Sequence, residues 1–299
     1  MTAPPRVAVI GGTGFVGSAV VDALTARGAE PILVRAPRLS QTSADDAIDD
    51  LRGCLDGCVA VVNAAGLSDA VSGDADALDI ANGRLPGIIA QVCRDLDVFF
   101  VHVSSAAVQG DREELDNSPQ VDAQTPYSRS KALGEAEVRE RGGRYVIYRP
   151  PGVHAPSRRV TQQLIRVASS PLATFVGDGT YPTAQALLPN VADAIAFLAL
   201  LPQDQRPPSI VHHPSEGLTT RQLLELLGGR PPRRLPVPAA RGATSLLDVL
   251  SKVQPALGGH RRRLEMLWFG QRQAPSWLTG AGWRPVADER DWEKLRGAE

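Results

Sequence analysis

The stretch Arg6-Val7-Ala8-Val9-Ile10-Gly11-Gly12-Thr13-Gly14-Phe15-Val16-Gly17 decides the fold. A short β-branched run enters a turn with three spaced glycines, and the amphipathic run Phe15–Arg27 follows, which predicts a strand, a tight turn and a helix. Gly11 can adopt a backbone conformation that a side chain forbids, Gly14 leaves room for a phosphate, and Gly17 lets the helix pack closely on the strand. The free N–H groups of the first helical turn attract phosphate. We therefore expect the pyrophosphate of a dinucleotide here, held by Gly11, Thr13, Gly14, Phe15, Val16 and Gly17.

The position of the glycine motif favours a nucleotide site over a glycine-rich turn without a ligand, because the motif follows the first strand of the chain. The second predicted strand, Pro31–Val34, ends in Arg35, with Arg38 close behind. NAD-binding folds usually place an acidic residue there to hold the adenosine ribose hydroxyls. A guanidinium instead binds a 2′-phosphate in bidentate fashion. Both arginines therefore favour NADP(H) over NAD(H), and a solvated surface arginine is the alternative.

Strands and helices alternate as far as residue 151, at the spacing of βαβ units. This predicts an α/β fold of the Rossmann type, with a doubly wound parallel sheet. Further strands are predicted at residues 39–42 (a weak one), 59–63, 99–103 and 145–148. Further helices are predicted at residues 44–55, 76–96 and 127–141. We expect a dinucleotide-binding domain over residues 1–151, with elements returning near 190–213. Residues 152–299 then form mainly a smaller substrate-binding domain.

The composition is that of an ordinary soluble globular protein, with 43% apolar and 22% charged residues among 299. A formal net charge of −1 argues against a nucleic-acid or membrane-surface partner. The sequence has no apolar run as long as a membrane span and no signal-peptide pattern at its start. These features predict a cytoplasmic protein that acts on a small molecule.

Cysteine and histidine spacing predicts no metal site. Cys54 and Cys58 lack zinc-type companions, so these cysteines and Cys93 are expected to be free buried thiols. His212 and His213 are adjacent but have no spaced carboxylate or cysteine set.

Tyr127 and Lys131 provide the main chemical signal. Four residues apart on a predicted helix, they lie on one face, where the ammonium favours the phenolate and so helps the phenol to move protons near neutral pH. Ser105 follows a predicted strand, at the sheet edge that lines the ligand crevice, and its hydroxyl can donate to the same substrate oxygen. Ala64 and Ala65 follow another strand and are small enough to let a cofactor lie against the backbone.

Several motifs resemble the extended short-chain dehydrogenase/reductase family, also called the NAD-dependent epimerase/dehydratase family. They occur in the family's order over essentially the whole chain: the glycine turn, Ser104-Ser105-Ala106-Ala107-Val108, Pro126-Tyr127-Ser128-Arg129-Ser130-Lys131, Arg149-Pro150 and Val191-Ala192-Asp193. The resemblance implies a Rossmann domain with a small C-terminal substrate domain, a catalytic serine at Ser105, an acid/base tyrosine at Tyr127 and a lysine at Lys131. It also implies that Asn82 corresponds to an asparagine that the family often has on the helix before the serine strand. Lys131 and Pro150 are expected to contact the cofactor.

The sequence departs from the family pattern at some positions. Gln109 and His154 stand where the family often has tyrosine. Nucleotide-sugar members often carry an arginine shortly before the Val-x-Asp motif, whereas the run Ala184–Asn190 has none. Arg158, Arg159 or the cluster Arg261-Arg262-Arg263 can replace it, and a solvated basic helix face is the alternative for the cluster.

The resemblance therefore implies a reductase or epimerase that acts on a carbonyl or hydroxyl carbon of a nucleotide-activated sugar. The missing arginine keeps a ketoreductase of a non-sugar natural product as an alternative. A non-catalytic NADP-binding sensor is a third hypothesis, against which the Tyr127/Lys131 pair counts. A 4,6-dehydratase is disfavoured because no acidic residue adjoins Ser105. Any homodimer is expected to form through the helices around 76–96 and 127–141.

Overall fold

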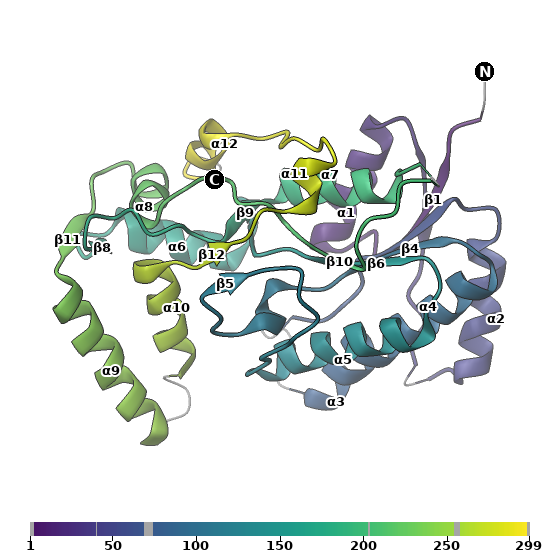
Figure 1. Ribbon diagram of the computed structural model, residues 1–299, viewed down its shortest axis with the longest axis horizontal. Helices are drawn as coiled ribbons and strands as arrows, with labels where there is room; N and C mark the ends of the chain where they lie inside the picture. The colour runs from purple at the N-terminus through teal and green to yellow at the C-terminus, as the bar shows by residue number, and fades with distance from the viewer. Residues whose placement is uncertain (1–2, 40, 69–73, 203, 254–257, 298–299) are drawn as a thin grey trace.

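A parallel six-stranded sheet forms the centre of the computed structural model, which describes residues 3–39, 41–68, 74–202, 204–253 and 258–297 (Figure 1). The strand order is β10-β6-β4-β3-β1-β2. The strands are β1 (Arg6–Ile10), β2 (Glu30–Val34), β3 (Ala60–Asn63), β4 (Phe99–Val103), β6 (Tyr145–Arg149) and β10 (Ile210–His212). Every neighbouring pair is parallel, so the predicted doubly wound sheet is confirmed.

The sheet is covered by helices on both faces, which explains its continuous apolar strands. Helices α1 (Phe15–Ala26) and α7 (Leu188–Ala199) pack on one face, and α2 (Ala44–Leu55), α4 (Leu85–Asp95) and α5 (Pro126–Arg141) pack on the other (Figure 1). Because β2 lies on one side of β1 and β3 on the other, the direction in which successive strands are added to the sheet reverses at β1. Open α/β sheets bind ligands at the carboxyl ends of the strands at such a point.

Helix α7 brings the later part of the chain back to the sheet. Arg27, which directly follows α1, donates two hydrogen bonds to the Asp193 carboxylate, at 2.8 and 2.7 Å. The Trp283 indole donates to the same carboxylate at 2.9 Å. The aspartate of the Val-x-Asp motif therefore fixes α7 against α1, and β10 follows it into the sheet.

Residues beyond β6, together with β5 from the preceding part of the chain, form three short parallel strand pairs, and a group of helices accompanies them (Figure 1). The pairs are β7 (Gly152–His154) with β9 (Gln185–Leu187), β8 (Thr174–Val176) with β11 (Arg233–Leu235), and β5 (Glu114–Leu115) with β12 (Arg272–Gln273). The helices are α6 (Arg159–Ser169), α8 (Thr220–Gly228), α9 (Val237–Val253), α10 (Gly258–Phe269), α11 (Trp277–Gly280) and α12 (Glu289–Lys294). None of the described helices is long and apolar enough to cross a membrane.

Three local expectations were wrong. The predicted strand at 39–42 is instead a turn, where the backbone N–H groups of Gln41 and Thr42 both donate to the Arg38 carbonyl; residue 40 lies outside the described residues. The predicted helix over 76–96 is divided into α3 (Ala75–Leu78), the π-helix η1 (Asp79–Arg84) and α4. The Cys54 thiol is exposed, while those of Cys58 and Cys93 are buried as expected.

A fully buried ion pair connects three elements at the carboxyl end of the sheet. The Glu135 carboxylate of α5 accepts from Arg149 Nε at 2.9 Å and Nη2 at 2.6 Å, and both side chains are inaccessible to solvent. Ser104, just after β4, donates to Glu135 at 2.6 Å. The remaining Nη1 group of Arg149 donates to the Ser118 carbonyl at 2.8 Å. The pair therefore fixes α5 against the ends of β4 and β6.

Removing the negative charge at Glu135 should be costly. Glu135→Gln leaves the Arg149 guanidinium buried without a counter-charge, so we expect a loss of about 3–5 kcal/mol in the free energy of unfolding. Glu137→Gln is the matched control, because that partly exposed side chain pairs with Arg141 at 3.3 Å and should cost less than about 1 kcal/mol. Urea unfolding of the parent and both variants measures the difference. Equal losses in the two variants would contradict the expected role of the buried pair.

Candidate active site

The glycine turn after β1 has the shape of a phosphate cradle. Gly11 has φ +82°, and a Cβ there would lie 2.6 Å from the backbone nitrogen of Ala65. A Cβ at Gly17 would overlap the Gly11 carbonyl, so the close packing of α1 on β1 needs glycine. Among the described residues no side chain caps the amino end of α1, which begins after Gly14. Its first N–H groups are thus available to a phosphate, and the turn fits a dinucleotide.

The side chains of Arg35 and Arg38 lie on the exposed surface beyond β2. Strand pairing places Val34 opposite Ile10, so Arg35 directly follows β2 where Gly11 directly follows β1. The structure therefore brings Arg35 to the same edge of the sheet as the glycine turn. The Arg38 carbonyl closes the turn that follows.

Helix α5 presents the tyrosine and the lysine. Its first turn is fixed by a capping box between Thr125 and Ser128, so Tyr127 lies half-buried at the amino end of the helix. Lys131, one turn later, is buried, and its Nζ donates to the Val103 carbonyl at the end of β4, at 3.1 Å. Ser105 lies two residues beyond Val103; it is half-buried, and its Oγ accepts from the Ala107 N–H at 3.2 Å. The three predicted residues thus lie at the carboxyl end of β4 and on the helix that packs there.

The Lys131 ammonium is poorly solvated. Burial lowers the pKa of Lys131 from 10.5 to about 8, against the opposing effect of the Glu135 carboxylate. A Cβ at Gly66, after β3, would lie 3.0 Å from Lys131 Nζ. The amine therefore faces the backbone that follows β3, where Ala64 and Ala65 are half-buried. The Lys131 amine thus lies next to the segment of small residues that is expected to line a cofactor.

Asn82 holds this segment in place from π-helix η1. Its Oδ1 accepts from the Leu67 N–H at 3.0 Å, and its Nδ2 donates to the Leu67 carbonyl at 2.9 Å and to Ser130 Oγ at 3.0 Å. Asn82 thus connects the loop after β3 with α5, next to Lys131. π-Helical turns are frequent at functional sites.

Sequence reasoning alone does not place His102 in the site, and it indicates Arg158 only as one candidate to replace the arginine that nucleotide-sugar members often carry. His102 is fully buried in β4; its Nδ1 lies 3.4 Å from Asn63 Nδ2, and its Nε2 has no partner within the described ranges. Burial, and then the Lys131 charge, lower the pKa of His102, so the ring stays neutral. A histidine inside an apolar strand was the available signal.

The Arg158 guanidinium lies over the ring of Phe15, 5.0 Å from its centroid. Its Nη1 donates to the Val153 carbonyl. Burial lowers the pKa of Arg158, and the electrostatic interaction with nearby Tyr127 partly opposes this shift. Arg158 is therefore positioned between the glycine turn and Tyr127. Arg159, the next residue, is exposed.

The arginine cluster at 261–263 was the other candidate to replace the arginine that nucleotide-sugar members carry before the Val-x-Asp motif. Arg262 donates to the Asp111 carboxylate and the Gly110 carbonyl, so it bonds within the protein and is not part of a solvated basic face. The side chains of Arg261 and Arg263 lie outside the described residues. The run Ala184–Asn190 contains β9 and the start of α7 and carries no cation.

Two sequence comparisons define the family. The NAD dependent epimerase/dehydratase family matches residues 7–211. A protein described as probable low-salt glycan biosynthesis reductase Agl14, from Haloferax volcanii, is 30% identical over 227 residues, which span 69% of this chain and 74% of that protein. This chain belongs to the NAD-dependent epimerase/dehydratase family. It is therefore an NAD(P)-dependent enzyme of the epimerase and reductase type.

Solved structures share the fold over nearly the whole chain. The dTDP-4-dehydrorhamnose reductase of Bacillus anthracis, in complex with NADP, has a TM-score of 0.67 at 14% identity and covers 99% of this chain and 98% of its own. The human epimerase family protein SDR39U1 with NADPH has a TM-score of 0.69 at 19% identity, covering 98% and 100%. UDP-glucuronic acid 4-epimerase of Bacillus cereus, with NAD, has a TM-score of 0.65 at 16% identity, covering 97% and 96%. At these identities the likeness establishes the fold.

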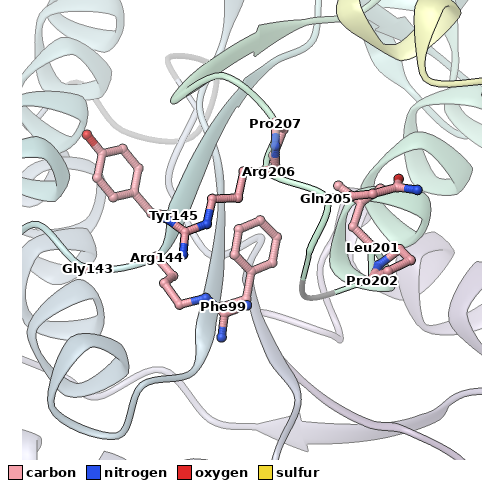
Figure 2. Close-up of a pocket in the computed structure, with 9 residues that line it drawn as sticks. All are labelled: Phe99, Gly143, Arg144, Tyr145, Leu201, Pro202, Gln205, Arg206 and Pro207. Carbon is pink, nitrogen blue, oxygen red and sulfur yellow. The ribbon is translucent and has the colours of Figure 1, made fainter.

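A small pocket lies away from this family site. It is lined by residues from the starts of β4 and β6 and from the loop after α7, including Phe99, Arg144, Tyr145 and Arg206 (Figure 2). These are the amino ends of the strands, opposite to the edge where α/β sheets bind ligands. Its volume of about 130 Å³ is below the ~300–1,000 Å³ of typical small-molecule sites. The pocket is therefore not the candidate active site.

The buried amine of Lys131 predicts a pH-dependent stability. Because its pKa in the folded protein, about 8, lies below the 10.5 of an exposed lysine, burying the charged amine costs stability at neutral pH. This cost disappears as pH rises from about 8 to about 10.5. The cofactor-free parent should therefore gain stability relative to Lys131→Met over that range, by up to roughly 3 kcal/mol. Urea unfolding of both proteins across the range measures the difference, and a flat or falling difference would contradict it.

Proposed function

We propose that this protein is an NADPH-dependent reductase that acts on a carbonyl carbon of a nucleotide-activated sugar. The observation that carries the proposal is the Tyr127/Lys131 pair on α5, with Lys131 buried against the end of β4 and the backbone at Gly66. The Haloferax relative is described as a reductase of glycan biosynthesis, which supports reduction of a sugar. The dTDP-4-dehydrorhamnose reductase with the same fold agrees with this choice.

Each residue of the site would have a separate role. Tyr127 donates the proton that the carbonyl oxygen takes up, and Ser105 donates a hydrogen bond to the same oxygen. Lys131 favours the phenolate of Tyr127 by its charge and binds the nicotinamide ribose. The glycine turn holds the pyrophosphate, with Ala64, Ala65 and Pro150 lining the site. The nicotinamide, when bound, supplies the hydride that the carbonyl carbon accepts.

Reduction is favoured over epimerisation by the residues after β2. Arg35 and Arg38 can bind a 2′-phosphate, which distinguishes NADP(H) from NAD(H). A reductase releases the oxidised cofactor after each turnover, whereas an epimerase returns the hydride to the same substrate. Residues 152–299 would then supply most of the substrate-binding surface. A homodimer through the helices around 76–96 and 127–141 stays a prediction.

A reductase of a non-sugar ketone is the second candidate. The run Ala184–Asn190 carries no cation, and its residues form β9 and the first turn of α7. The usual arginine contact to a nucleoside diphosphate is thus absent from this segment. A substrate panel should therefore include simple ketones together with 4-keto nucleotide sugars.

Stoichiometry of cofactor use tests the proposal. With cofactor removed and one equivalent of NADPH added, a 4-keto nucleotide sugar should oxidise one NADPH per substrate, seen as lost absorbance. Tyr127→Phe should lower turnover by a factor on the order of 10²–10⁴, because the carbonyl oxygen loses its proton donor. NADPH affinity should survive that change, since the phenol is assigned to the substrate.

The competing functions give different results in the same experiment. Many turnovers without net oxidation of the nucleotide would indicate an epimerase. Activity on simple ketones alone would favour the second candidate. Near-parental turnover by Tyr127→Phe would show that Tyr127 is not the proton donor. Binding of NADPH without turnover of any compound in the panel would favour the sensor hypothesis.

Cofactor choice is tested at Arg35. Arg35→Ala should weaken NADPH binding by about 1.5–3 kcal/mol, the range for hydrogen bonds to charged groups, and leave NADH binding little changed. Arg38→Ala is the companion variant, since both side chains are exposed after the same strand. Calorimetry on all three proteins measures this. Equal affinities of the parent for NADPH and NADH would contradict the assignment.

A further inference from the structure

We propose that the Arg158 guanidinium binds a diphosphate group between the glycine turn and Tyr127. The inference rests on the proposed function, because it takes this crevice as the site of cofactor and substrate. Arg158 precedes α6, so the binding group would come from the part of the chain beyond residue 151.

Contacts from three segments fix the guanidinium. It lies over the Phe15 ring, 5.0 Å from the centroid, and Phe15 is the first residue of α1. Its Nη1 is bonded to the Val153 carbonyl at β7, and it is close enough to Tyr127 for the two to interact electrostatically. A long cationic side chain is thus held at the crevice and not extended into solvent.

Within the described part of the chain, no carboxylate forms an ion pair with Arg158. Its hydrogen bond to the Val153 carbonyl uses a single Nη1 group, which leaves further donors of the guanidinium for a ligand. A partly buried cation with spare donors is expected to meet an anion when the site is filled. The neutral Val153 carbonyl cannot supply that charge.

The anion best suited to this place is a diphosphate. The guanidinium fork matches phosphate oxygens in bidentate geometry, and the uncapped N–H groups of α1 lie beside Phe15. Two diphosphates fit the proposed reaction, that of the cofactor and that of a nucleoside-diphosphate sugar. For the second, Arg158 would supply the cation that the run Ala184–Asn190 lacks.

Calorimetry distinguishes the two sources. The parent, Arg158→Gln, Arg158→Lys and Arg159→Gln are titrated with NADPH, and then with UDP and with dTDP in the presence of saturating NADPH. Arg159→Gln is the matched control, because Arg159 is the adjacent arginine and is exposed. Thermal unfolding of each variant confirms that it is folded. Arg158→Lys keeps the charge without the fork, so its binding should fall between those of the parent and Arg158→Gln.

The expected result is a loss of about tenfold or more in one affinity in Arg158→Gln, with a change of less than about twofold in Arg159→Gln. Loss of NADPH affinity identifies the cofactor diphosphate, and loss of UDP or dTDP affinity identifies that of the substrate. Unchanged affinities in a folded Arg158→Gln, or equal losses in both variants, would overturn the inference while leaving the proposed function intact. A parent that binds none of the three compounds would overturn both.

Discussion

The Glu135 carboxylate accepts hydrogen bonds from Ser104 and from two nitrogens of Arg149, in an interior that water does not reach. Desolvation of the two charges offsets much of their attraction, so the pair adds little net stability. Its effect is on geometry, because any slide of α5 along β4 or β6 would leave a buried charge unpaired. Tyr127, Lys131 and Glu135 follow one another at intervals of four residues on α5. The position of the buried pair therefore sets the position of the two residues that face the crevice.

Close backbone packing imposes a second constraint at the same edge. A Cβ at Gly134 would overlap the Asn82 carbonyl, and one at Gly66 would lie 2.6 Å from Asn82 Oδ1. Glycine at both positions lets π-helix η1 and the loop after β3 lie directly against α5. Only at this separation can the Asn82 amide reach Leu67 and Ser130 together. Small residues and the buried ion pair thus act together to fix the floor of the proposed cofactor site.

Features that depend on local sequence could be predicted. The β-branched run before the glycine turn predicts β1, and the four-residue spacing of Tyr127 and Lys131 predicts their common helix face. The division of helix 76–96 could not be foreseen, since the widened turn is held by contacts with α5. Arg158 and His102 gain their significance from neighbours distant in the chain, Phe15 for the first and Lys131 for the second. The site assignments from the sequence stay predictions, although the structure brings them to one edge of the sheet.

The segment between Ser105 and Tyr127 is held by the last third of the chain. Gln271 donates to the Arg112 carbonyl at 2.7 Å, and β12 pairs with β5 inside this segment. The same segment supplies the Ser118 carbonyl, which accepts from Arg149. The C-terminal elements are thus connected, through one loop, to the buried pair that positions α5. A shift of these elements would have to be absorbed by that loop, because separating Arg149 from Glu135 would leave the buried Arg149 guanidinium without its counter-charge. The arrangement keeps these C-terminal elements in register with Tyr127.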